Sequence, residues 1–156
     1  MAEKINLDKF FEKKFLDGST LRIGIVVSIF NHEITSQMYN VAYNELIKNG
    51  VDEKKIKKVN VPGAFELPIM CKKMAETKKF DSIIAIGVVI KGETDHYEFV
   101  ATNATKGISN TSLITGVPII FGILTTNNYE QARDRIIDSE YYAKTAIIVP
   151  NTINYL

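Results

Sequence analysis

Leu-Arg-Ile-Gly-Ile-Val-Val-Ser-Ile-Phe occupies residues 21–30 and is a nearly continuous run of apolar, mostly β-branched residues. Such a run is typical of a strand that is buried on both faces in a parallel sheet. Directly after it, apolar residues recur at helical spacing from Ile34 to Leu46, and Asn49-Gly50 supplies a helix end. We therefore expect a buried strand followed by a helix.

This strand–helix unit repeats along the chain. Further strands are expected at 56–61, 82–90 and 118–124, and helices at 67–75 and from about 97 to 111. Parallel neighbours need crossover connections, and a helix supplies one. Four buried strands that alternate with four helices therefore predict a three-layer α/β/α sandwich, flavodoxin-like, around a mostly parallel four-stranded sheet.

The end of the chain is less regular. Asn127, with Glu130 three residues later, resembles a capping box that would open the last long helix. Pro150 is expected to end any helix, because proline lacks the N–H donor and clashes with the preceding turn. The stretch 146–151 is left unassigned for this reason.

Composition agrees with one globular domain over residues 1–156, of which 1–20 form an arm without clear periodicity. The chain is 46% hydrophobic and 24% charged, which is typical of a globular protein. A chain of this size builds a core without metals or crosslinks. Cys71 is the single cysteine, so it forms no internal disulfide, and its position on an apolar helical face indicates core packing.

The charge balance argues against some partners. The 19 basic and 18 acidic residues leave a formal charge of +1, which provides no electrostatic footprint for nucleic acid or an anionic membrane. No apolar run approaches the ~20 residues of a membrane span, and the charged N-terminus lacks the apolar core of a signal peptide. We therefore expect a cytoplasmic protein.

The segment Gly92-Glu93-Thr94-Asp95-His96 is the most informative for chemistry. Ligands of open parallel sheets bind beyond the carboxyl ends of the strands, where this segment lies. A glycine turn that feeds a helix N-terminus presents N–H groups to an anion, so it predicts a phosphate site. Histidine titrates near neutral pH and suits proton transfer. A helix-capping turn with a solvent-facing histidine remains the alternative.

Other candidates carry weaker signals. Arg135, expected two turns inside the last helix, can bind phosphate bidentately or lie on a solvated face. Glu66 can cap a helix or accept hydrogen bonds from a polyol. Phe30 and Phe65, at strand ends, can stack on a planar ring or pack in the core. His32 has no acidic or cysteine partner at ligand spacing, so we predict a surface residue and no metal site.

Four ordered blocks are similar to the 6,7-dimethyl-8-ribityllumazine synthase family of riboflavin biosynthesis. They are Ile-Gly-Ile-Val-Val-Ser-Ile-Phe-Asn (23–31), Val-Pro-Gly-Ala-Phe-Glu-Leu-Pro (61–68), Gly-Val-Val-Ile-Lys-Gly-Glu-Thr-Asp-His-Tyr-Glu (87–98) and Gly-Val-Pro-Ile-Ile-Phe-Gly-Ile-Leu-Thr-Thr (116–126), followed by Glu130-Gln131-Ala132. The resemblance covers about residues 21–135. It implies condensation of 5-amino-6-(D-ribitylamino)uracil with 3,4-dihydroxy-2-butanone 4-phosphate, with release of phosphate and water and without metal or organic cofactor.

The resemblance also implies roles for individual residues. The residues that it assigns to substrate binding are Phe30, Asn31, Ala64, Phe65, Glu66, Val88, Val89, Ile90 and Phe121. Phosphate binding falls to Gly92, Glu93, Thr94 and Arg135, and proton transfer to His96. Phe30 would stack on the pyrimidine, and Glu66 would bind ribityl hydroxyls. Glu93 would contribute its backbone, since its carboxylate repels an anion.

In the family, the counterparts of Phe121 and Arg135 come from a neighbouring subunit. The resemblance therefore implies a homo-oligomer with sites between subunits, either a pentamer or a pentamer-based shell. Residues 136–156 diverge from the usual glycine- and lysine-rich continuation. Lys144 would match a family lysine only after a one-residue slip, so we leave it out of the site.

Two other classes of function remain open. One is a noncatalytic flavin- or lumazine-binding protein or scaffold on the same fold, in which the divergent C-terminus has lost turnover. The other is a phosphosugar isomerase or aldolase, which needs a Schiff-base lysine or a close carboxylate pair. Lys91 is the single candidate for such a lysine. The set of Glu66, Thr94, His96 and Arg135 favours the synthase.

Overall fold

The computed structural model describes residues 4–156 and contains one four-stranded sheet. Its strands are β1 (Ile23–Ser28), β2 (Ile56–Val61), β3 (Ser82–Ile90) and β4 (Ile119–Thr126). They lie in the order β2-β1-β3-β4, and every neighbouring pair is parallel. The predicted parallel sheet is confirmed.

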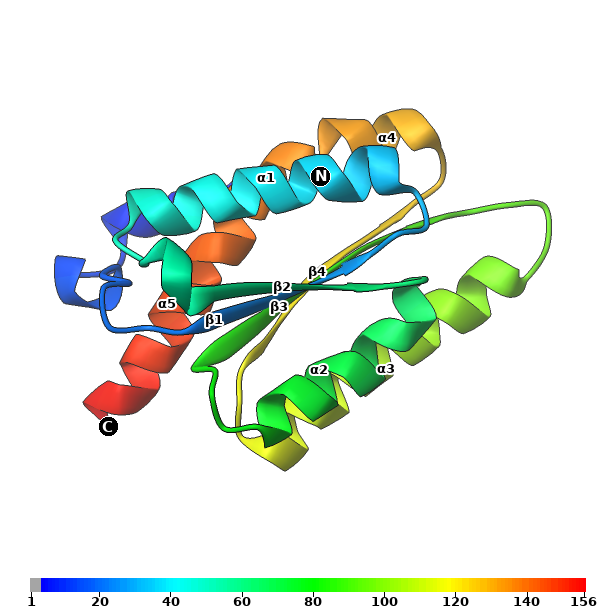
Figure 1. The fold of residues 1–156 in the computed structure, drawn as a ribbon. Coiled ribbons are helices and arrows are strands. Elements are labelled where there is room, and N and C mark those ends of the chain that lie inside the picture. Colours follow the sequence, from blue (N-terminus) through cyan, green and yellow to red (C-terminus); the bar gives the residue numbers. More distant parts are fainter. Residues whose placement is uncertain (1–3) are drawn as a thin grey trace.

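Helices cover both faces of this sheet (Figure 1). One face carries α1 (His32–Lys48), α4 (Tyr129–Asp134) and α5 (Ser139–Tyr155), and the other carries α2 (Leu67–Glu76) and α3 (His96–Thr115). Short 3-10 helices are η1 (Leu7–Lys9), η2 (Lys13–Phe15), η3 (Glu53–Lys55), η4 (Ala64–Glu66) and η5 (Ile136–Asp138). The predicted three-layer α/β/α architecture is therefore confirmed. Among the residues described, none of the helices combines the length and hydropathy that crossing a bilayer requires.

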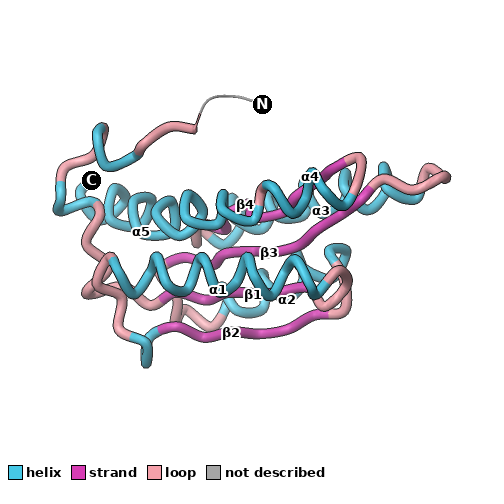
Figure 2. Tube along the Cα trace, turned by 90° about the horizontal axis from the view of Figure 1, so that it is seen from above, coloured by secondary structure: helices cyan, strands magenta, loops and turns pink. Residues whose placement is uncertain are grey.

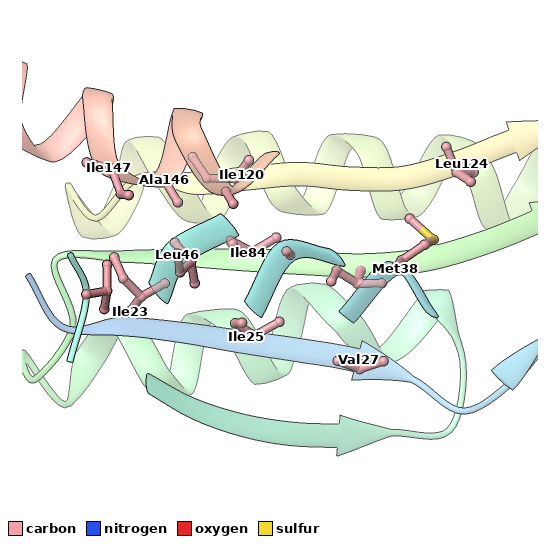
Figure 3. Close-up of a cluster of buried hydrophobic side chains, with 14 of the residues drawn as sticks. Ile23, Ile25, Val27, Met38, Leu46, Ile84, Ile120, Leu124, Ala146 and Ile147 are labelled. Carbon is pink, nitrogen blue, oxygen red and sulfur yellow. The ribbon is translucent and has the colours of Figure 1, made fainter. Parts of the chain in front are cut away.

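Two apolar clusters fill the spaces between the sheet and its helices. Figure 3 shows the first, in which Ile23, Ile25 and Val27 of β1 pack with Leu46 of α1 and with α5. The second lies under α2 and α3 and contains Cys71, which is fully buried. Core packing of Cys71 is thus confirmed, and burial raises the pKa of its thiol to about 12. Burial on both faces accounts for the unbroken apolar runs of β1 and β3.

Pro150 lies inside α5, so the expectation that it ends any helix is wrong. Proline at this position leaves the carbonyl of Ala146, four residues earlier, without its usual N–H donor. The buried hydroxyl of Ser82, at the start of β3, donates to that carbonyl at 2.6 Å. A tertiary hydrogen bond therefore replaces the missing helical one, and the helix continues to Tyr155.

The predicted last long helix is two helices. α4 has six residues and α5 has seventeen, and η5 separates them. The N-cap is Asn128 and not Asn127: Asn128 Oδ1 accepts a hydrogen bond from the backbone N of Gln131 at 2.9 Å. The expected capping box is thus wrong by one residue, because two cap-forming asparagines are adjacent.

The segment before β1 lies against α5 (Figure 2). Lys4 Nζ lies 3.0 Å from Asp138 Oδ1, and Lys144 Nζ donates to Asp8 Oδ2 at 3.1 Å. Lys144 Nζ also lies 3.7 Å from Glu45 Oε1. Lys144 therefore links this segment to the helices through ion pairs. Lys144 does not line the cavity described next.

Candidate active site

A cavity of about 600 Å³ opens at the carboxyl end of the sheet, where β1 and β3 meet η4 and the first turn of α3. This is where the ligands of open parallel sheets bind. Its lining consists of Phe30, Gly63, Ala64, Phe65, Glu66, Val88, Val89, Ile90, Gly92, Thr94, His96, Tyr97, Phe99 and Val100. Ten of these residues were candidates from the sequence.

Two aromatic side chains stand at the mouth of the cavity. Phe30 follows β1 and is 71% exposed, and Phe65 in η4 is 58% exposed. Such exposure excludes core packing as their role. Large aromatic faces left open beside an apolar cavity suit stacking on a planar ring.

Glu66 closes η4 and lines the cavity. Its Oε2 accepts a hydrogen bond from the backbone N of Gly63 at 3.0 Å. The capping role anticipated for this carboxylate is therefore present. A carboxylate has two oxygens with about four acceptor positions, so a capping contact on Oε2 leaves Oε1 free to accept hydrogen bonds from a ligand.

The glycine turn precedes α3, a helix of twenty residues. The first N–H groups of a helix carry partial positive charge and mostly lack an intrahelical acceptor, although the backbone N of Glu98 donates to the carbonyl of Asp95 at 3.0 Å. Thr94 Oγ1 accepts a hydrogen bond from the first of these N–H groups, that of His96, at 3.4 Å. Thr94 and His96 are exposed at the rim of the cavity, and a Cβ added at Gly92 would meet no atom within 4 Å. The turn is open to solvent and has space for a ligand.

Asn31 connects the ends of the two central strands. It has left-handed backbone geometry (φ 61°, ψ 40°), and its Nδ2 donates to the carbonyl of Val88 at 3.0 Å. Its side chain lines a neighbouring cleft of about 630 Å³ together with Phe30 and His32. Phe30 thus forms the wall between this cleft and the main cavity.

Besides Asn31, three candidates lie outside the cavity of their own chain. Glu93 is exposed and does not line it. Phe121 is 41% exposed on the edge strand β4, in a separate cavity of about 370 Å³ with Tyr141 and Tyr142. Arg135 is the C-cap of α4, which corrects its expected place two turns inside a helix. A complete set of the candidates therefore does not form within one chain.

Four lining residues were not predicted: Gly63, Tyr97, Phe99 and Val100. Tyr97 and Val100 are three residues apart and so share a face of α3. The helix expected from about residue 97 contained this signal. Phe99 is exposed, and its position in the sequence carries no sign of a cavity.

The cavity offers no evident metal site. Within residues 4–156, no group of three or more His, Cys, Asp or Glu side chains is placed to hold a metal ion. His32 is exposed, as predicted.

The fold and cavity define an α/β protein with an open cavity at the carboxyl edge of a parallel sheet, beside a helix N-terminus. The family model described as 6,7-dimethyl-8-ribityllumazine synthase matches residues 20–153, so the chain belongs to this family of riboflavin-biosynthesis transferases. The match extends past residue 135 and includes most of the segment that departs from the usual family pattern. The resemblance read from four sequence blocks is confirmed.

Proposed function

We propose that this protein condenses 5-amino-6-(D-ribitylamino)uracil with 3,4-dihydroxy-2-butanone 4-phosphate to 6,7-dimethyl-8-ribityllumazine, the penultimate step of riboflavin biosynthesis. The observation that carries the proposal is the content of the 600 Å³ cavity. The cavity is lined by exposed aromatic rings, a carboxylate and a histidine, and it lies beside a helix N-terminus. These groups match a planar heterocycle, a polyol, a proton transfer and a phosphate.

The heterocyclic substrate fits the β1 and η4 side of the cavity. Phe30 provides a face for the pyrimidine, and Asn31 and the Ala64-Phe65 backbone bind its polar edge. Glu66 accepts hydrogen bonds from ribityl hydroxyls through the oxygen that does not cap η4. The apolar floor of Val88, Val89 and Ile90 excludes water beneath the ring.

The phosphate fits the turn Gly92–Thr94, where the backbone N–H groups and the dipole of α3 favour an anion. The amine of the pyrimidine then attacks the ketone to form a Schiff base and water. Elimination of phosphate follows, ring closure onto the second amine then releases a second water, and His96 carries the protons for these steps. Holding the two substrates together removes the cost of their encounter, so positioning supplies much of the catalysis.

A second copy of the chain completes the site. Phe121 and Arg135 lie outside the cavity of their own chain, and the family role given to them requires a neighbouring subunit. Arg135 adds a charge-assisted contact to the phosphate, and Phe121 adds an aromatic wall. We therefore propose a cytoplasmic homo-oligomer, a pentamer or a pentamer-based shell, with its sites between subunits.

The proposal is tested by mixing the purified protein with both substrates and following the lumazine chromophore and phosphate release. A sample without protein is the control, because the substrates condense slowly on their own. Acceleration of both signals supports the proposal. A folded oligomer that accelerates neither signal contradicts it and favours a noncatalytic binding protein or scaffold.

A further inference from the structure

α4 is too short to be stable on its own. It spans only Tyr129–Asp134, and Arg135 ends it. Isolated helices shorter than roughly 12 residues are marginal in water, so contacts outside the helix must hold this segment. The orientation of Arg135 depends on those contacts.

Side-chain hydrogen bonds hold the N-terminal end of α4. Asn128 Oδ1 accepts from the backbone N of Gln131 at 2.9 Å, and Gln131 Oε1 accepts from the backbone N of Asn127 at 2.8 Å. Thr126 Oγ1 donates to the carbonyl of Asn128 at 2.9 Å. The first of these bonds satisfies a backbone N–H that a helix start leaves without a partner, and the other two hold the chain that leads into the helix.

The C-terminal end of α4 holds the guanidinium of Arg135. The backbone N of Arg135 donates to the carbonyl of Ala132 at 3.1 Å, so the last turn is tight. The carbonyl of Gln131, one residue earlier, instead accepts from Nη1 of Arg135 at 2.8 Å. Arg135 forms no ion pair within the described part of the chain. The guanidinium N–H groups that do not bond to Gln131 are therefore available to bind an anion.

We propose that Asn128 and Gln131 are positioning residues that orient Arg135 toward the phosphate of the substrate. Gln131 connects both ends of α4: its N–H and side chain close the N-terminal end, and its carbonyl holds the guanidinium. Loss of the Asn128 cap loosens the single turn of α4 that fixes the position of the Gln131 carbonyl. The inference rests on the proposed function, because it requires Arg135 to bind phosphate in the assembled protein.

Other contacts keep α4 in place when the cap is lost. Ala132 is fully buried in the core, and the hydroxyl of Tyr129 donates to Glu33 Oε2 of α1 at 3.0 Å. Figure 1 shows α4 beside the first turn of α1. A cap substitution should therefore change the orientation of the Arg135 side chain while the fold remains intact. This outcome distinguishes a positioning role from simple structural support.

The test compares two adjacent asparagines in the full chain and its native assembly. Asn128→Ala should raise KM for the butanone phosphate and Kd for inorganic phosphate about fivefold, the factor of a typical lost helix cap. KM for the pyrimidine should not change. Asn127→Ala should have no effect, because only the backbone of Asn127 is bonded, and Asn128→Ser should restore phosphate binding.

Several outcomes overturn the inference. They are an unchanged phosphate KM in Asn128→Ala, an equal rise in both KM values, or a fall in kcat that follows a fall in Tm. Gln131→Ala, which removes the acceptor of the Asn127 N–H, provides the same comparison if Asn128→Ala does not fold. Arg135→Ala separates the two proposals. If it raises the phosphate KM and Asn128→Ala does not, only the positioning inference fails, whereas no effect of Arg135→Ala refutes the proposed role of Arg135 itself.

Discussion

The hydrogen bond between Ser82 and Ala146 should hold α5 together at Pro150. Ser82 and Ala146 are both 0% exposed, and the Ser82 hydroxyl is the donor to the Ala146 carbonyl. Ser82→Ala leaves this carbonyl buried without a partner, because proline offers no N–H. Such a loss costs about 2 kcal/mol of unfolding free energy, which corresponds to a fall in Tm of roughly 4–8 °C for a chain of this size.

A second substitution should remove most of that cost. In Pro150→Ala the restored amide N–H can donate to the Ala146 carbonyl as in an ordinary helix. Ser82→Ala should then cost less than about 1 kcal/mol, because no orphan carbonyl remains. The two positions are therefore predicted to couple by about 1 kcal/mol or more in a double-mutant cycle.

Urea unfolding, followed by circular dichroism, measures this cycle. The four proteins compared are the unsubstituted chain, Ser82→Ala, Pro150→Ala and the variant with both substitutions. All four are compared at one protein concentration, since assembly changes apparent stability. Thr152→Ala is a matched control: the exposed Thr152 donates through Oγ1 to the carbonyl of Ile148 at 2.7 Å in the same helix, so its loss should cost little. An equal cost of Ser82→Ala in both backgrounds would refute the reasoning.

Further predictions concern buried groups and the histidine of the cavity. The Ser28 hydroxyl is buried without a hydrogen-bond partner among the described residues, so Ser28→Ala should raise the unfolding free energy by about 1 kcal/mol; a clear loss in urea titrations would show that the hydroxyl is bonded. Burial raises the pKa of Tyr142 from 10.0 to about 12. The unfolded chain therefore ionises this hydroxyl first, stability falls as pH rises between these values, and Tyr142→Phe should flatten that fall. Cys71 is buried, so a thiol reagent should label it only as fast as the protein unfolds, and rapid labelling of native protein would contradict its place in the core. His96→Ala should lower kcat roughly 10- to 100-fold with little change in either KM, whereas His32→Ala, the other histidine, should leave kcat as it is.

The sheet could be predicted because its signal is local. Both faces of β1 and β3 are buried, and this requires the continuous apolar runs that the sequence displays. The cavity could be predicted in part for the same reason, since parallel strands bring residues such as Phe30 and the Gly92 turn to one edge.

The course of the C-terminal third depends on partners far away in the chain. Pro150 is tolerated because Ser82, 64 residues before Ala146, supplies the missing donor, and local pattern contains no trace of this bond. The break between α4 and α5 is likewise absent from the local pattern. Arg135 therefore lies at a helix end and not within a helix, which places its side chain outside the cavity of its own chain.

The central claim is that one site is built from the cavity of one chain and Arg135 of another. Assembling His96→Ala chains together with Arg135→Ala chains tests it most directly, because each variant lacks a different part of the site. If the claim holds, about one boundary in four pairs an intact cavity with an intact arginine. Lumazine formation by the mixed assembly should then rise well above the mean of the two separate variants. A mixture that never exceeds this mean would contradict the account.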